Sequence, residues 1–239
     1  MADNEFTIDE QPVPFKPGQT ILDAAKAAGI YIPHLCYNSE FKAHGGCKMC
    51  TVLVNGRTQT ACTHKAAAGQ EIDVNTPDLD ATRRSIVQML FIEGNHFCPG
   101  CEKSGNCQLQ ALGYEYEMMS PHFVEFFPHR EVDASHPDVL IDFNRCILCE
   151  LCVRASRDAD HKEVFAIAGR GLDARLIINS PTGKLGDSAF AITDRAANVC
   201  PVGAILVKDS GFKTPIGERT YDRASISAEA DSCEVPERT

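Results

Sequence analysis

Hydrophobic and polar residues alternate over residues 4–15. Because successive side chains of a strand point to opposite faces, this alternation predicts a hairpin of two short strands. Thr20 then stands where a helix N-cap would, directly before an apolar stretch that Gly29 closes. A capping residue, an apolar stretch and a terminal glycine together predict a helix over residues 21–28.

A second hairpin is expected after a long irregular stretch. Residues 30–48 show no period and contain two adjacent glycines, which predicts a loop. Two β-rich runs at 50–54 and 58–62 flank Asn55-Gly56, the dipeptide that most strongly favours a two-residue hairpin turn. With a last short strand expected at 71–74, these elements predict an α+β domain.

The pattern becomes helical in the middle of the chain. Apolar residues recur at intervals of four over residues 78–93, and Gly94 follows them, so a helix is expected there. A second helix is expected over 106–118. Residues 120–137 are rich in histidine, proline and aromatic residues, which favours a connector.

The last part of the chain predicts a third unit of short strands between glycine turns. Strands are expected at residues 164–167, 174–178 and 190–193. Beyond residue 220 the chain becomes polar and charged, which predicts an extended tail. The expected division of the chain is therefore 1–77, 78–120, 121–220 and a polar C-terminal tail at 221–239.

Composition excludes several classes of protein. Apolar residues make up 44% of the chain, enough for a buried core, but no run reaches the roughly 18 apolar residues of a membrane span. The N-terminus is polar and acidic and lacks the features of a secretory signal, so a cytoplasmic location is expected. The net charge of −10 argues against nucleic-acid binding.

The twelve cysteines are the strongest chemical signal in the sequence. Thiols stay reduced in the cytosol, so a disulfide framework is not expected there. Cys-x2-Cys pairs recur in each group of cysteines, and such pairs are typical of metal ligation or redox chemistry. Metal centres are therefore expected in three places.

The first group combines one tight pair with two distant cysteines. Cys36, Cys47, Cys50 and Cys62 follow the spacing Cys-x10-Cys-x2-Cys-x11-Cys. Structural zinc sites usually contain two tight pairs, whereas here the first cysteine lies in a glycine-containing loop whose N–H groups can approach a negatively charged centre. A 2Fe–2S cluster is favoured over the alternative, a four-cysteine zinc site. With the elements before it, this region resembles the plant-type ferredoxin (β-grasp) fold, although the cysteine spacing differs.

The third group has the spacing of bacterial ferredoxins. Cys146, Cys149 and Cys152 stand at intervals of three, and Cys200-Pro201 follows much later. Three thiolates on one tight turn and a fourth from a distant segment predict a 4Fe–4S cluster. No second triplet lies in this unit, so one cluster is expected rather than two; the alternative is a set of buried structural thiols.

The middle group is incomplete as a set of thiolates. Cys98, Cys101 and Cys107 supply three, and His96 stands nearby. Imidazole is a competent iron ligand, so His96 is the expected fourth ligand of a second 4Fe–4S cluster. Cys233, in the polar tail, is the alternative. The sequence contains no dinucleotide fingerprint, phosphate loop or Ser/His/Asp grouping, so no substrate site of its own is expected.

The order of the three regions resembles the N-terminal part of the large iron–sulfur subunit of respiratory complex I and the accessory region of iron-only hydrogenases. The likeness covers residues 4–210 and is carried most sharply by NHFCPGCEKSGNCQLQ at 95–110 and CILCELCVR at 146–154. Complex I homologues typically place the histidine four residues before the first cysteine, whereas His96 lies two residues before Cys98.

A short chain of this kind, without the large molybdopterin-type domain, is similar to the diaphorase iron–sulfur subunit of the soluble NAD-reducing nickel–iron hydrogenases. The resemblance implies an α+β fold with an N-terminal plant-type ferredoxin-like domain, a helical one-His, three-Cys cluster segment and a C-terminal 4Fe–4S ferredoxin-like domain. It implies one 2Fe–2S and two 4Fe–4S clusters, with FMN and NAD only on a partner subunit. The implied partners are the flavin/NAD-binding diaphorase subunit and the hydrogenase small and large subunits, and the implied function is electron relay from H2 oxidation to NAD+ reduction.

Two alternatives stay open from the sequence. The same relay is expected in an NAD-dependent formate dehydrogenase or a complex I-like module. A zinc-binding scaffold that only organises partners predicts a colourless protein that contains zinc instead of iron and sulfide. The ferredoxin-type spacing of the third group argues against the scaffold.

Overall fold

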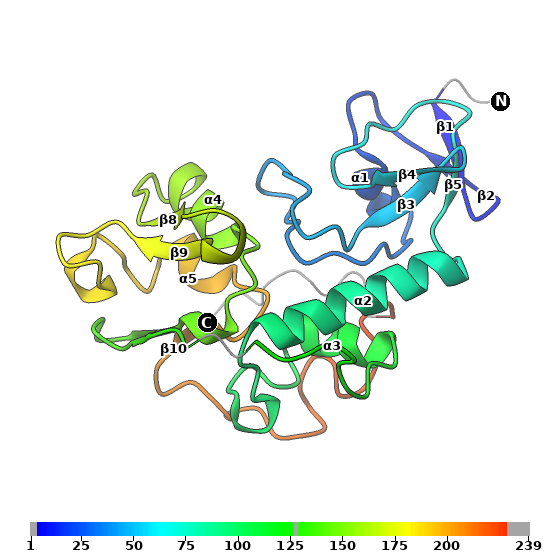
Figure 1. The fold of residues 1–239 in the computed structure, drawn as a ribbon. Helices are drawn as coiled ribbons and strands as arrows, with labels where there is room; N and C mark the ends of the chain where they lie inside the picture. The colour runs from blue at the N-terminus through cyan, green and yellow to red at the C-terminus, as the bar shows by residue number, and fades with distance from the viewer. Residues whose placement is uncertain (1–3, 127–128, 229–239) are drawn as a thin grey trace.

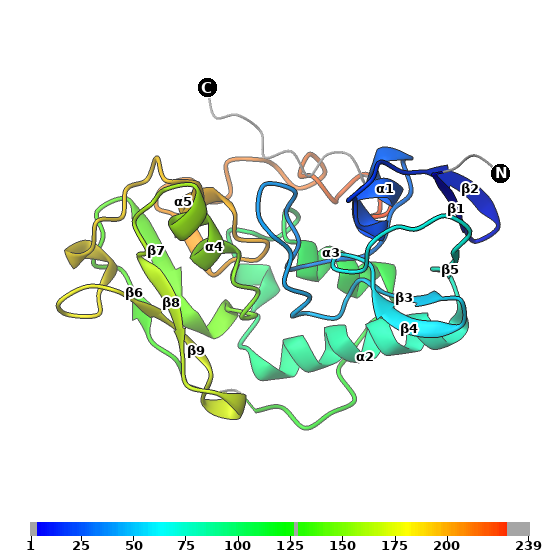
Figure 2. The same cartoon turned by 90° about the horizontal axis from the view of Figure 1, so that it is seen from above.

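The computed structural model describes residues 4–126 and 129–228. An N-terminal unit and a C-terminal unit lie at opposite ends of the molecule, and helix α2 (Pro77–Glu93) runs between them in both views (Figure 1 and Figure 2). At 17 residues α2 is still neither long nor apolar enough to cross a membrane, and the same holds for every other helix among the described residues.

The N-terminal unit is a five-stranded sheet with one helix packed against it. The strand order is β2-β1-β5-β3-β4, in which only β1 and β5 are parallel. The elements are β1 (Glu5–Ile8), β2 (Gln11–Pro14), α1 (Ile21–Ala27), β3 (Thr51–Val54), β4 (Arg57–Thr60) and β5 (Glu71–Asp73). Both predicted hairpins and the predicted helix are confirmed, and Thr20 caps α1 in a capping box with Asp23.

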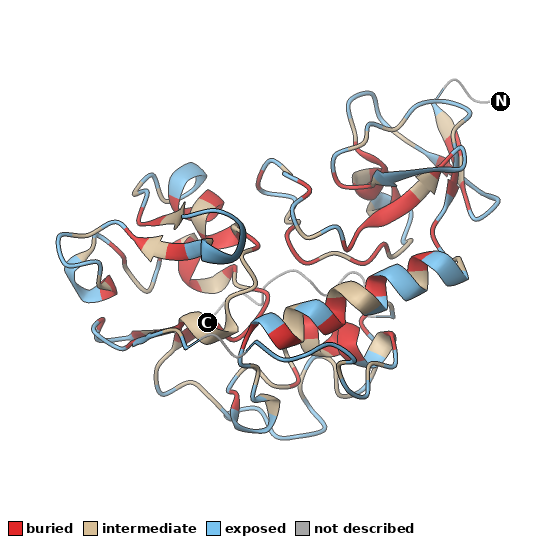
Figure 3. Cartoon of the chain, in the orientation of Figure 1, coloured by how far each residue is buried: buried red, intermediate tan, exposed pale blue. Residues whose placement is uncertain are grey.

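The middle of the chain is helical, as expected. α2 begins after the N-cap Thr76 and ends before Gly94, while α3 (Gln108–Glu115) is shorter than predicted. Figure 3 shows that buried and exposed residues alternate along α2, as the pattern of an amphipathic helix requires. The fully buried Arg83 attaches α2 to the N-terminal sheet, because it donates to the carbonyls of Val74 and Thr51 at 2.8 and 2.9 Å.

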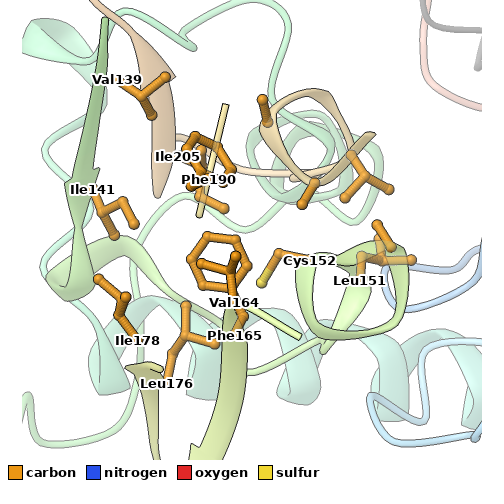
Figure 4. Packing of buried hydrophobic residues seen from close by; sticks show 14 of the residues in the cluster. Val139, Ile141, Leu151, Cys152, Val164, Phe165, Leu176, Ile178, Phe190 and Ile205 are labelled. Atoms are coloured by element: carbon orange, nitrogen blue, oxygen red, sulfur yellow. The ribbon is translucent and has the colours of Figure 1, made fainter. Parts of the chain in front are cut away.

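The C-terminal unit consists of two small sheets and two helices. A three-stranded sheet has the order β10-β7-β6, and β8 and β9 form a separate hairpin. The elements are β6 (Val132–Asp133), β7 (Val139–Asp142), α4 (Leu151–Asp158), β8 (Phe165–Ala168), β9 (Arg175–Ile178), α5 (Arg195–Asn198) and β10 (Ile205–Val207). Figure 4 shows side chains of β7, α4, β8, β9 and β10 in one apolar core that also holds Cys152.

Two expectations for this part of the chain are wrong. Residues 190–193 form a turn instead of a strand, since the side chain of Asp194 accepts a hydrogen bond from the N–H of Ala191 at 2.8 Å. Residues 221–228 fold back instead of extending: Ile226 is buried in the core between α2 and α3. In both cases apolar side chains hold the segment against the molecule: Phe190 and Ile192 in the first, Tyr221 and Ile226 in the second.

Candidate functional site

The β3–β4 hairpin brings two cysteines of the first group together. Cys50 directly precedes β3, Cys62 follows β4, and the N–H of Ala61 donates to the Cys50 carbonyl at 2.9 Å. Cys36 and Cys47 come from the long loop after α1. The thiols interact in two pairs, Cys36 with Cys47 and Cys50 with Cys62. Two pairs of thiols suit a two-iron cluster, in which each iron takes two cysteine ligands.

One thiol in each pair of the first site ionises more easily than a free cysteine. The hydrogen bond from Cys36 lowers the pKa of Cys47 to about 7, and the N–H of Met49 acts in the same direction. The hydrogen bond from Cys50 likewise lowers the pKa of Cys62. Thiolates are the form that binds metal. The first site therefore already carries part of the negative charge that a bound cluster requires from its cysteines.

The third site is shaped by left-handed backbone between its cysteines. Leu148 has φ 52° and Glu150 has φ 58°, values that residues other than glycine rarely adopt. Left-handed residues that alternate with residues of ordinary backbone conformation turn successive N–H groups toward the same side of the chain. This arrangement binds anions and iron–sulfur clusters. The N–H of Leu148 acts on the Cys146 thiol and that of Leu151 on the Cys149 thiol.

All four cysteines of the third site line one cavity. Its other walls are mostly apolar, and the lining includes Cys146, Cys149, Cys152, Cys200, Ile147, Leu148, Val202 and Ile205. Burial raises the pKa of the Cys146 thiol to about 11 and also raises that of Cys149 and Cys152. Such thiols ionise only when a cationic group enters the cavity. The donors and the cavity therefore fit a 4Fe–4S cluster.

A structural zinc ion needs four ligands that converge on it, at about 2.3 Å for sulfur. Among the described residues, no group of three or more His, Cys, Asp or Glu side chains is arranged to hold one metal ion.

The middle site combines a buried imidazole with three cysteines. Cys98–Gly100 form one turn of 3-10 helix, and Cys107 caps α3. Nε2 of His96 is buried and has no hydrogen-bond partner among the described residues, and a buried ring nitrogen in that position is available to a metal. Burial lowers the pKa of His96 to about 4, with a further contribution from the charge of Arg145. The ring is therefore neutral, as ligation requires.

The C-terminal unit completes the middle site. A Cβ on Gly203 would lie 2.6 Å from Sγ of Cys101, so the backbone after the third site's last cysteine packs directly on a cysteine of the middle site. The N–H of Gln108 donates to the Pro201 carbonyl at 3.0 Å. Glycine is required at position 203 because of this close approach.

Gly203→Ala is expected to remove the middle cluster, because the added methyl group displaces the Cys101 sulfur. The iron content of the anaerobically purified chain should fall by about four atoms, the content of one 4Fe–4S cluster. Gly113→Ala is the matched control, since a Cβ there makes ordinary contact with Phe91 at 3.6 Å. Unchanged iron in Gly203→Ala would contradict this account of the packing.

The first and third sites are joined by a buried arginine. Arg154, on α4, is 4% exposed. Its Nη2 donates to the carbonyls of Cys36 at 2.5 Å and Cys149 at 3.2 Å, and its Nη1 donates to the Lys42 carbonyl at 3.1 Å. One guanidinium thus donates hydrogen bonds to a cysteine carbonyl of the first site and to a cysteine carbonyl of the third site.

The three sites also share one apolar core. Leu35 and Met49, from the loop of the first site, are buried in it. Cysteines from all three sites pack in the same core: Cys47, Cys107, Cys146 and Cys200. The third site, last in the sequence, contacts both of the others. Cys233 lies outside the described residues.

Family models match the chain in the order of these regions. A 2Fe-2S iron-sulfur cluster binding domain matches residues 3–77, the NADH-ubiquinone oxidoreductase-G iron-sulfur binding region matches 83–122, and a 4Fe-4S single cluster domain matches 139–207. The gamma subunit of the NAD-reducing hydrogenase HoxS of Cupriavidus necator is 40% identical over 95% of this chain and 96% of its own length. The chain belongs to the family of NAD-reducing hydrogenase gamma subunits.

Other relatives of this chain are longer. The NADH-ubiquinone oxidoreductase 78 kDa subunit of Candida albicans is 30% identical over 89% of this chain but only 30% of its own length. The NADH dehydrogenase [ubiquinone] iron-sulfur protein 1 of Solanum tuberosum is 31% identical over 87% of this chain and 28% of its own length.

A solved structure supports the same assignment. The crystal structure of an NAD+-reducing [NiFe]-hydrogenase in the H2-reduced state contains a chain that is 54% identical to this one, with a TM-score of 0.92 over 95% of this chain and 97% of that chain. The comparisons confirm the expected resemblance, the α+β fold with its ferredoxin-like ends, and the expectation of an iron–sulfur electron-transfer subunit.

Proposed function

We propose that the chain relays single electrons through one 2Fe–2S and two 4Fe–4S clusters, between a nickel–iron hydrogenase module and a flavin/NAD-binding subunit. The observation that carries this proposal is the packing of three thiol-rich sites around one core, with the third site in contact with the other two. The gamma subunit of the NAD-reducing hydrogenase HoxS and one chain of the NAD+-reducing [NiFe]-hydrogenase structure, each matched over nearly its full length, support the choice of partners.

The proposed ligands follow the three sites. Cys36, Cys47, Cys50 and Cys62 hold the 2Fe–2S cluster; Cys146, Cys149, Cys152 and Cys200 hold one 4Fe–4S cluster; and His96, Cys98, Cys101 and Cys107 hold the other. FMN and NAD belong to the partner subunit. A cytoplasmic location is part of the proposal, because so many free thiols require a reducing compartment.

The residues of the chain have distinct tasks in this relay. When bound, the clusters supply one-electron redox states. Ile147 and Leu148 line the third cavity and limit the access of water. Inward N–H groups, such as that of Leu148, stabilise negative charge on sulfur. The neutral imidazole of His96 makes the middle cluster less negative than four thiolates would.

Metal analysis of the anaerobically purified chain tests the proposal. The three clusters predict about ten iron and about ten sulfide per chain, with little zinc. A measured content of about six iron atoms per chain would mean that the chain holds one 4Fe–4S cluster fewer than proposed. A chain that contains zinc without sulfide would contradict the electron relay, and the zinc-binding scaffold would be the remaining function.

The assembled complex tests the choice of partners. Hydrogen gas is expected to reduce the clusters of this chain and then NAD+, whereas formate is not. Reduction by formate instead of hydrogen would replace the hydrogenase with a formate dehydrogenase as the electron source, and the chain would remain a relay.

A further inference from the structure

Arg145 reaches from the third site to the middle site. It directly precedes Cys146, at the end of the short turn Phe143–Arg145. Its Nη1 lies 3.4 Å from Sγ of Cys101 and 3.4 Å from the carbonyl oxygen of Gly203. Among the described residues, none of its hydrogen bonds goes to a thiol of the third site. The guanidinium therefore serves the neighbouring site, not the one that its own segment forms.

A carboxylate fixes the orientation of this guanidinium. Nε of Arg145 forms an ion pair with Oδ2 of Asp142 at 2.9 Å, and the two side chains are 17% and 12% exposed. The other oxygen of Asp142 accepts the N–H of Asn144 at 3.0 Å. With Asp142 held by the backbone and Nε held by Asp142, Nη1 is directed at the sulfur. Glu102 contacts the same Nη1 at 3.4 Å.

The charge of Arg145 reaches more of the middle site than Cys101 alone. Besides its contact with Cys101, it influences both His96 and Cys98 electrostatically. A cluster becomes more negative when it accepts an electron. A hydrogen bond from a cation to a ligand sulfur stabilises that reduced state more than the oxidised state, and so raises the reduction potential.

We propose that Arg145 is a positioning residue that raises the reduction potential of the middle cluster by donating a charged hydrogen bond to Cys101. The proposal rests on the proposed cluster at His96, Cys98, Cys101 and Cys107. Replacing Arg145 removes the cation and leaves the carboxylates of Asp142 and Glu102 beside the cluster. Both changes lower the potential.

Redox titration followed by electron paramagnetic resonance tests this in the anaerobically purified full chain. Arg145→Gln is expected to shift the reduction equilibrium of the middle cluster at least tenfold toward the oxidised form, about 59 mV for one electron. Arg145→Lys keeps the charge without the planar fork and should shift the equilibrium by less. His96→Cys identifies the middle cluster's signal, because it changes that cluster's ligand.

Internal controls separate a tuned potential from general damage. Arg157→Gln is the control for the loss of an arginine, since Arg157 is exposed on α4 and pairs with the neighbouring Asp158. Its middle cluster should shift far less than that of Arg145→Gln, and in Arg145→Gln the 2Fe–2S cluster should keep its own potential. Full iron content with an unchanged middle potential in Arg145→Gln overturns the role of Arg145. A wild-type chain without a middle cluster overturns the proposed function instead.

Discussion

His96→Ala is expected to lower the iron content of the chain from about ten to between about six and about nine atoms, because one iron of the proposed 4Fe–4S cluster loses its protein ligand. Nε2 of His96 is buried and has no partner among the described protein groups, while the rest of the ring packs against Phe91 and bonds to the Leu90 backbone. The measurement is iron and sulfide per chain after anaerobic purification. In the assembled complex, hydrogen-dependent NAD+ reduction is expected to fall with the iron content.

His122→Ala is the matched control, since His122 is exposed and far from the cysteines in sequence. It should keep all of the iron. His96→Cys should also keep it, with a lower potential for the middle cluster, because a thiolate adds negative charge. If His96→Ala retained full iron, the fourth ligand would be sought elsewhere, and Cys233→Ala would be the next variant.

Arg154→Met is expected to destabilise the protein by about 3 kcal/mol, because it leaves buried carbonyl groups without their charged donor. For a chain of this size, that loss corresponds to a decrease of about 6–12 °C in the unfolding temperature. The bonds that are lost join Cys36 and Cys149, which belong to different sites. Circular dichroism of the anaerobic protein during heating measures the change.

Arg157→Met separates this effect from a general effect of losing an arginine in α4. Arg157 lies on the same helix, is exposed and pairs with the neighbouring Asp158. Its unfolding temperature should stay that of the wild type. Equal unfolding temperatures for Arg154→Met and Arg157→Met would show that the buried bonds between the sites contribute nothing.

The elements that the sequence predicts well are those whose signals are local. Asn55-Gly56 and the flanking β-rich runs are adjacent in the chain, and the hairpin forms there. The spacing of Cys146, Cys149 and Cys152 is equally local, and their thiols line one cavity with the distant Cys200. The ligand assignments themselves remain predictions.

The relation between the sites could not be predicted, because it depends on long-range contacts with no pattern in the sequence. Arg145 and Cys101 are 44 residues apart, and although Arg145 and Arg154 flank the third group of cysteines, nothing in the sequence indicates which distant residues they contact. Leu148 and Glu150 are poor candidates for left-handed backbone by residue type. The left-handed backbone at these two positions is required by the turn that carries the three cysteines, not by the residue types.

The bond between Arg154 and Cys36 has a consequence for biosynthesis. The two residues are 118 positions apart, so the ribosome delivers all four cysteines of the first site well before the arginine that secures their loop. Until translation passes residue 154, the Cys36 carbonyl lacks its donor. The nascent chain thus displays the four cysteines of the first site in a loop that is not yet secured, and that loop is completed only after the carboxyl-terminal unit has folded.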